Sequence, residues 1–229
     1  SILIIKKEEE IPGGVLAIAK IVSKFTMRVN LFINEKKIEI KRKIVDLSKH
    51  ENLKNKYLKL NPWGTVPFLV VKKKVIAESI AICKYLDSLS PSSPNLFGNN
   101  PIEIATIEMY RRKIEFDGIQ SAGEAFRNSA KSFKDRAFAG TEKISQIPEL
   151  INRGKIRTEI FFNFLNKTLK NNKYVAGNKF SIADIDAYVT LSFAKWIKID
   201  GTNKRKYVKN WKLNLEKRNA FKKYNNLFK

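Results

Sequence analysis

Cysteine and histidine are nearly absent from this sequence. Its 229 residues include one cysteine, Cys83, and one histidine, His50. A single thiol cannot close an internal disulfide, and one cysteine with one histidine falls short of the four ligands of an ordinary structural zinc site. The sequence therefore predicts a protein without a structural metal. Nothing in its cysteine content requires an oxidising compartment, so we expect a cytoplasmic protein.

Long hydrophobic runs are missing as well. No apolar stretch approaches the roughly 20 residues that cross a bilayer, so we expect no membrane span. Residues 1–5 are apolar, but residues 8–10 are all acidic, which is unlike a secretory signal. We interpret residues 1–14, which end in Pro-Gly-Gly, as an N-terminal extension.

Acidic residues are scarce relative to basic ones. The chain has 45 Lys and Arg against 22 Asp and Glu, a formal net charge of +23. Such an excess is found in proteins with a surface that binds nucleic acid or an anionic membrane. The lysines are spread over the whole chain, however, and in residues 200–229 they alternate with apolar residues at helical spacing. This pattern favours solvated basic faces over a specific nucleic-acid site, although a general attraction for anionic substrates fits either view.

The first part of the chain, residues 15–89, alternates between strand and helix patterns. In the segment 38–47, Ile38, Ile40 and Ile44 are separated by charged residues, which predicts a half-buried strand. The alternation indicates a small α/β domain with a mixed sheet. The expected order is strand 15–22, helix 26–35, strand 38–47, short helix 51–60, strands 68–71 and 75–76, and a helix from residue 78.

The sequence pattern of residues 102–229 predicts helices throughout. Residues 90–101 are rich in proline, serine and asparagine and predict a linker, so we place a second domain at 102–229. Ile104, Ile156 and Ile160 are among the repeating apolar positions of its first two long helices, and a third, almost wholly apolar helix belongs in the middle of a bundle. The expected helices are 102–131, 149–170, 181–196 and 207–223.

The stretch 61–87 combines a turn, an extended Val66-Pro67 step, a short hairpin and a helix that opens at Glu78-Ser79. Its segments NPWGTVP and AESIAICKYL, together with VAGNKFSIADIDAY at residues 175–188, resemble the soluble glutathione S-transferase family. AFRN, DRAFAG and QIPELINRG resemble stretches of bacterial members. The resemblance covers roughly residues 15–224. It implies a thioredoxin-like domain with a mixed four-stranded sheet, an all-helical domain, a two-fold homodimer and a role in detoxification.

The resemblance also implies a glutathione site in the N-terminal domain. The backbone of Val66, before Pro67, would pair with the cysteinyl part of glutathione. Ser79 would hold the γ-glutamyl carboxylate at a helix N-terminus, which offers free N–H groups, and Glu78 would lie near the amine. Asn52 matches the ligand of the glycyl carboxylate best, with His50 also in range. A plain helix start, an ordinary trans proline and a solvated loop are the structural alternatives.

Activation of the glutathione sulfur is implied at the segment between the first strand and first helix. Counting back from MRV, Ser23 falls where serine- and cysteine-type members carry the activating residue, and Thr26 is the alternative. Lys24 stands where the family often has proline. Ser23 could also simply cap the helix. Because it is not a cysteine, mixed-disulfide chemistry is disfavoured, and Cys83 lies at a core spacing.

The predicted reaction is nucleophilic addition of the glutathione thiolate to a small, apolar electrophile. Tyr110, Arg111 and Ile114 are candidates for contacting this second substrate, although side chains at their spacing are more often core. Ser181 and Asp184 predict a structural capping box. Alternatives are a glutathione-dependent isomerase, dehalogenase or peroxidase, or a non-catalytic transferase-like binding or assembly domain.

Overall fold

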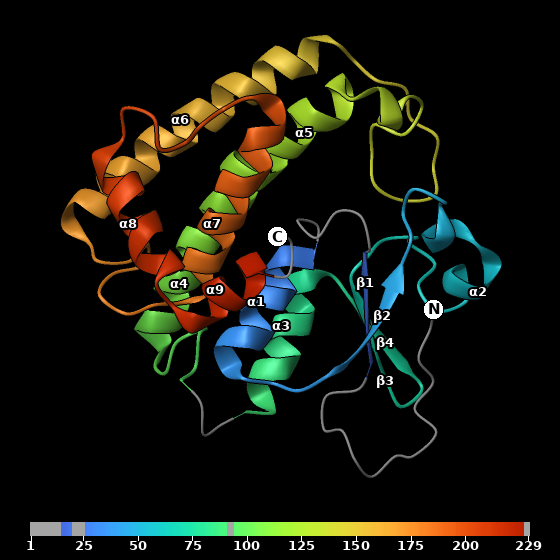
Figure 1. Cartoon of the computed structure of the whole chain (residues 1–229), viewed down its shortest axis with the longest axis horizontal. Coiled ribbons are helices and arrows are strands. Elements are labelled where there is room, and N and C mark those ends of the chain that lie inside the picture. Colours follow the sequence, from blue (N-terminus) through green and yellow to red (C-terminus); the bar gives the residue numbers. More distant parts are fainter. Residues whose placement is uncertain (1–14, 20–25, 91–93, 227–229) are drawn as a thin grey trace. The chain divides into compact units, whose positions relative to one another are not determined.

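The computed structural model of the chain describes residues 15–19, 26–90 and 94–226 (Figure 1). Its contacts divide the chain into two units. The first holds the described residues up to Pro94, together with Ala139–Thr141 and those from Lys223 onward. The second holds Asn95–Phe138 and Glu142–Lys222.

The first unit is built on a mixed sheet in the order β2-β1-β3-β4. Strand β1 pairs in parallel with β2 and antiparallel with β3, which pairs antiparallel with β4. Figure 1 shows α1 and α3 on one side of the sheet and α2 on the other. The elements are β1 (Val15–Ala19), α1 (Met27–Lys36), β2 (Lys41–Val45), a 3-10 turn (Glu51–Leu53), α2 (Asn55–Leu58), β3 (Phe68–Val71), β4 (Lys74–Ala77) and α3 (Ser79–Ser88).

Alternation along the strands supplies a core on each face of this sheet. Phe68 packs with Val45 and Tyr57 in one cluster, while the next residue of β3, Leu69, is buried on the other face. The expectation for Ile44 was wrong, because its side chain is 51% exposed. Strand β2 is an edge strand, and the pleat turns Val45 toward the core and Ile44 away from that cluster.

Buried charge ties the ends of α1 and α3 together. Nζ of Lys36 lies 2.8 Å from a carboxylate oxygen of Asp87, and both side chains are almost wholly buried. The same ammonium group donates to the carbonyl oxygen of Pro94. The two helices are therefore fixed against each other at their C-terminal ends.

The second unit is helical. Helix α7 is its most enclosed element, since all its residues except Ser192 are buried, as the apolar sequence predicts. The fold class, a thioredoxin-like domain followed by an all-helical domain, is confirmed. The helices are α4 (Pro101–Lys113), a π-helical turn (Ile114–Ile119), α5 (Gln120–Ser129), α6 (Glu149–Asn171), α7 (Ile182–Ala194) and α8 (Lys206–Glu216), with 3-10 turns at Lys131–Phe133 and Lys195–Ile197. Helix α9 (Asn219–Asn226) begins in this unit, and its residues from Lys223 onward belong to the first.

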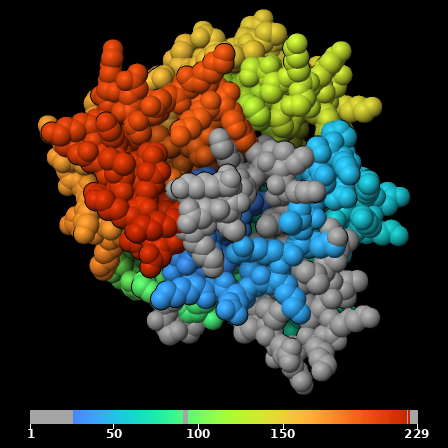
Figure 2. All heavy atoms as spheres, in the orientation of Figure 1, coloured from blue at the N-terminus to red at the C-terminus, as the bar shows by residue number. Residues whose placement is uncertain are grey.

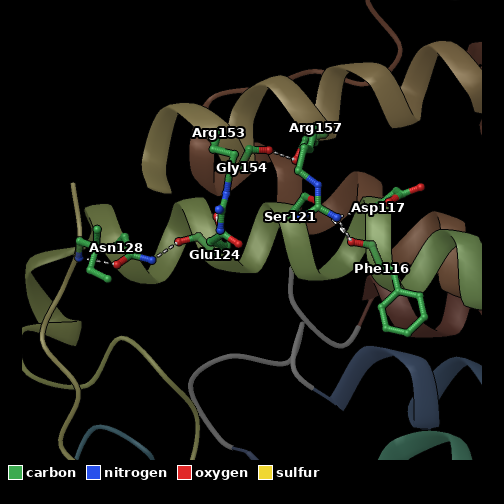
Figure 3. Close-up of polar contacts among 10 residues, drawn as sticks. Phe116, Asp117, Ser121, Glu124, Asn128, Arg153, Gly154 and Arg157 are labelled. Atoms are coloured by element: carbon green, nitrogen blue, oxygen red, sulfur yellow. Dashed lines mark hydrogen bonds and ion pairs between the residues drawn. The ribbon is translucent and has the colours of Figure 1, made fainter. Parts of the chain in front are cut away.

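The expected helix 102–131 contains an irregularity that its sequence pattern does not reveal. The π-helical turn leaves the carbonyl of Phe116 to accept hydrogen bonds from Arg157 on α6 and from the hydroxyl of Ser121 (Figure 3). Close packing continues along α5, where a Cβ at Gly154 would lie 2.6 Å from the carbonyl oxygen of Ser121. The backbones of α5 and α6 approach each other because position 154 has no side chain.

Three isoleucines assigned to apolar helix faces point largely to solvent. Ile104, Ile156 and Ile160 are 50%, 51% and 61% exposed, so their expected burial was wrong. In α6 the buried stripe is instead formed by Gly154, Thr158, Phe161, Phe162, Leu165 and Leu169. Small and polar residues take part in that stripe, which shifts its phase relative to the pattern of isoleucines.

Candidate functional site

The hairpin β3–β4 brings two distant parts of the predicted site to one end of the sheet. Phe68 pairs with Ala77 in the ladder. The Val66-Pro67 step immediately precedes Phe68, and Glu78-Ser79 immediately follows Ala77. The peptide bond between Val66 and Pro67 is cis. The register therefore places the predicted cysteinyl and γ-glutamyl contacts next to each other, although they are eleven or more residues apart in sequence.

Glu78 has an unusual backbone conformation at the start of α3. Its φ is 68° and its ψ is 125°, a region that residues with a side chain seldom adopt. Such a conformation costs on the order of 1–3 kcal/mol and is found mostly at functional sites. Its side chain is exposed and makes no capping hydrogen bond to α3, while its carbonyl accepts from the N–H of Ile82. The carboxylate is therefore presented to solvent.

Ser79 is half-buried and begins α3. Its hydroxyl oxygen accepts a hydrogen bond from Nη1 of Arg28, on α1, across 2.5 Å. Arg28 is only 8% exposed. Sequence reasoning missed this arginine, because it treated MRV as part of a helix pattern. A charged residue within the otherwise apolar and small segment TMRVNLFI was the available signal.

The structure describes only one of the two residues predicted to activate the glutathione sulfur. Ser23 lies outside the described residues. Thr26 is the N-cap residue of α1 and has no solvent exposure. Its hydroxyl oxygen accepts from the side-chain amide of Asn30 across 3.2 Å. Thr26 thus supports the start of α1 from within the protein.

Two asparagines brace the loop that leads into Val66. The amide nitrogen of Asn52 donates to the carbonyl oxygen of Gly64 across 2.7 Å, and that of Asn61 donates to the carbonyl of Thr65 across 2.9 Å. Gly64 has a φ of 63°, and an added Cβ would lie 2.8 Å from Leu53. His50 is exposed, precedes the turn Glu51–Leu53 and has a left-handed backbone.

The three second-substrate candidates belong to the second unit. Arg111 is buried and donates to the carboxylates of Glu108 and Glu115 over 2.7 to 2.9 Å. The hydrogen bond to Glu108 raises the pKa of Arg111, and burial opposes that rise. Ile114 is fully buried, and the ring of Tyr110 lies 6.3 Å from that of Phe164.

Ser181 and Asp184 form both halves of a capping box at the start of α7. The buried carboxylate of Asp184 accepts hydrogen bonds from the backbone N–H groups of Ser181 and Val175 and from the indole of Trp211. Burial raises the pKa of Asp184 to about 6, and these hydrogen bonds limit the rise. Every donor in this cluster is satisfied by the protein itself.

The described residues contain no group of three histidine, cysteine or acidic side chains that could hold a metal ion. Among the same residues, no helix has the length and apolarity to cross a membrane. Lys206 and Lys209 on α8, and Lys217 directly after it, are exposed. Figure 2 shows this segment in red as an outer surface of its unit, which fits the expectation of a solvated basic face.

Comparison with known proteins points to one family. The glutathione S-transferase N-terminal domain matches residues 22–89, and the C-terminal domain of the same family matches residues 150–219. "Glutathione S-transferase 1" of Dianthus caryophyllus is 30% identical over 164 residues, which cover 69% of this chain and 67% of that protein. "Glutathione S-transferase 2" of Saccharomyces cerevisiae is 27% identical over 180 residues, covering 78% of this chain and 75% of that protein.

Solved structures agree with this assignment. The crystal structure of Gtt2 from Saccharomyces cerevisiae has a TM-score of 0.82 at 25% identity and covers 92% of this chain and 99% of that chain. The Gtt2-class glutathione S-transferase of Vibrio parahaemolyticus has a TM-score of 0.78 at 28% identity, covering 92% of this chain and 96% of that chain. Together with the matched domains and relatives, these likenesses show that the chain belongs to the glutathione S-transferase family.

Proposed function

We propose that this glutathione transferase adds the thiolate of glutathione to small, apolar electrophiles. The observation that carries the proposal is the pairing of Phe68 with Ala77, which brings Val66 and the Glu78-Ser79 pair to one end of a hairpin. A tripeptide with a carboxylate, an amine and a peptide backbone requires complementary groups within a short span. Those groups are present at this end of the sheet.

Each part of glutathione is assigned a contact. The hydroxyl of Ser79 and the N-terminus of α3 bind the γ-glutamyl carboxylate, and the exposed carboxylate of Glu78 binds the neighbouring ammonium group. The backbone of Val66, held beside Pro67, pairs with the cysteinyl unit. Asn52, which braces the loop before Val66, and the exposed His50 are assigned to the glycyl end.

Ser23 is proposed to donate a hydrogen bond to the glutathione sulfur. A cysteine-like thiol titrates near 8.5, and lowering its pKa by about two units requires about 2.7 kcal/mol of preferential stabilisation of the thiolate. The thiolate then attacks an electrophilic carbon, forms the S–C bond and expels the leaving group. Thr26 is the weaker candidate, because it has no exposure to a ligand. Tyr110, Arg111 and Ile114 are the proposed contacts of the second substrate; Tyr110 is half-buried, and burial makes Arg111 and Ile114 the weaker candidates for the same reason.

A two-fold homodimer is also proposed. Ile102, Met109 and Phe116 recur at seven-residue spacing along α4 and the π-helical turn and are 76%, 60% and 42% exposed. Ile156 and Ile160 add an exposed pair on α6, whose Arg157 bonds to the carbonyl of Phe116. Exposed apolar residues gathered in this way are typical of a protein interface. We also propose a cytoplasmic location. The proposed domain limits are 15–89 for the thioredoxin-like domain, 90–101 for the linker and 102–229 for the helical domain.

The test is titration with glutathione followed by an activity assay. Calorimetry should give a dissociation constant below 1 mM, and the protein should conjugate glutathione to an aryl halide such as 1-chloro-2,4-dinitrobenzene. Ser23→Ala should lower conjugation with little change in glutathione affinity. Failure to bind glutathione at millimolar concentration would end the transferase proposal, and unchanged conjugation by Ser23→Ala would remove Ser23 as the activating residue.

A further inference from the structure

Arg28 connects helix α1 to the first residue of α3. Its Nη1 atom donates to the hydroxyl oxygen of Ser79 across 2.5 Å, over a sequence separation of 51 residues. Helices α1 and α3 pack side by side within the first unit (Figure 1). We propose that Arg28 is a positioning residue that orients Ser79 toward the γ-glutamyl carboxylate of glutathione. This inference rests on the proposed function of the Glu78-Ser79 end of the site.

The hydrogen bond determines what the Ser79 hydroxyl can do. A serine hydroxyl has one proton to donate and two lone pairs that accept. A guanidinium group is always protonated and has no acceptor, so Ser79 cannot donate to Arg28. The Ser79 proton is therefore directed to another acceptor. Because Ser79 is half-buried rather than enclosed, that acceptor can be a ligand that enters from solvent.

The same contact makes the hydroxyl a better donor to an anion. A lone pair that accepts from a charged donor polarises the O–H bond, and chained hydrogen bonds strengthen one another. The guanidinium charge also adds to the partial positive charge of the α3 N-terminus. Both effects favour a negatively charged acceptor at Ser79. A neutral ligand group would benefit much less.

Arg28 is held firmly enough for this role. It is 8% exposed, and the residues that follow it along α1 are buried from Val29 to Ile33. A long, flexible side chain that is enclosed in this way has already lost its rotamer freedom in the folded protein. Ligand binding then requires little further ordering. The opposite charge, Glu78, is exposed next to Ser79, so the site suits the carboxylate and ammonium groups of an α-amino acid.

The test compares glutathione with an analogue whose γ-glutamyl α-carboxylate is converted to the amide, which keeps the amine and the rest of the tripeptide. Titration calorimetry should show that the wild type prefers glutathione over the α-amide by about 10- to 100-fold. Arg28→Met should reduce this preference to about threefold or less and leave the affinity for the α-amide within about twofold.

Two further variants separate positioning from general effects. Lys84→Met removes an exposed positive charge from α3 and should keep the wild-type preference. Arg28→Lys keeps the charge but loses the planar geometry, so it should retain an intermediate preference. In a Ser79→Ala background, Arg28→Lys should cause little additional loss, because the two residues act through one contact. If Arg28→Met does not fold, as judged by circular dichroism, Arg28→Lys and this cycle carry the test.

Three results would contradict the inference. Arg28 variants that keep the wild-type preference would overturn it, and so would variants that lose affinity for both ligands equally, since that marks a purely structural role. Additive losses for Arg28→Lys and Ser79→Ala would also overturn it. In these cases the wild type still binds glutathione, so the proposed function survives. A wild type that does not bind glutathione would overturn both.

Discussion

Two helices in this protein, α7 and α3, each begin with a serine and an acidic residue, but these residues make different contacts at the two starts. At α7, Ser181 and Asp184 are buried, and the aspartate accepts hydrogen bonds from two backbone N–H groups and from Trp211. At α3, Glu78 is exposed without a capping bond and Ser79 accepts from Arg28. The first start is satisfied by the protein itself. The second leaves the Ser79 hydroxyl proton available for a further acceptor and the Glu78 carboxylate exposed, which suits a ligand site.

The largest expected effect is at the α7 start. Asp184→Ala should lower the free energy of unfolding by about 3–5 kcal/mol, because it leaves the Trp211 indole and two buried N–H groups without an acceptor. Urea unfolding measures the loss. Asp200→Ala is the control, because Asp200 is exposed and accepts hydrogen bonds from the backbone N–H and the hydroxyl of Thr202; its loss should cost less than about 1 kcal/mol. Equal losses in the two variants would contradict the structural role of Asp184.

The pH dependence of stability sharpens the same contrast. The folded pKa of Asp184 is raised to about 6, above its ordinary value of 3.8, mainly by burial. Between these values the folded state binds a proton that the unfolded state does not, so stability falls as pH rises through the folded pKa. The unfolding free energy of the wild type minus that of Asp184→Asn should fall by up to about 3 kcal/mol from pH 4 to pH 7. A difference that does not change with pH would contradict the raised pKa.

At the α3 start, the expected loss is in binding rather than stability. Ser79→Ala should weaken glutathione affinity by about tenfold or more, because a hydrogen bond to a charged group is lost. Its unfolding free energy should change by less than about 1 kcal/mol, since Ser79 is half-buried. Ser88→Ala is the matched control, because Ser88 is exposed at the other end of α3, where its hydroxyl donates to the carbonyl of Tyr85. Titration calorimetry measures the glutathione affinity of both variants, and an equal loss of affinity in the two would contradict the binding role of Ser79.

The smallest expected effect comes from backbone strain. Glu78→Gly should raise the free energy of unfolding by about 1 kcal/mol, since glycine tolerates a φ of 68° and the relief exceeds the entropy that glycine adds to the unfolded chain. Glutathione affinity should fall, because the carboxylate near the ammonium group is removed. A loss of stability would show that the Glu78 side chain supports the fold rather than the ligand.

The sequence predicted the parts of the site that are continuous along the chain. The hairpin and the Glu78-Ser79 helix start depend on local turn, strand and helix patterns, and the structure brings them together through a short-range pairing. The partnership of Arg28 with Ser79 depends on two helices packing together, which one sequence does not reveal. The phase of Ile156 and Ile160 was missed for a related reason, since small residues such as Gly154 can line a buried face.

The central claim is that the α3 start binds the γ-glutamyl end of glutathione. A crystal structure of the protein with glutathione tests this most directly. The account predicts the γ-glutamyl carboxylate within hydrogen-bond distance of the Ser79 hydroxyl, with the ammonium group beside Glu78 and the cysteinyl backbone against Val66. Glutathione bound elsewhere, or bound here with its glycyl end at Ser79, would contradict the account.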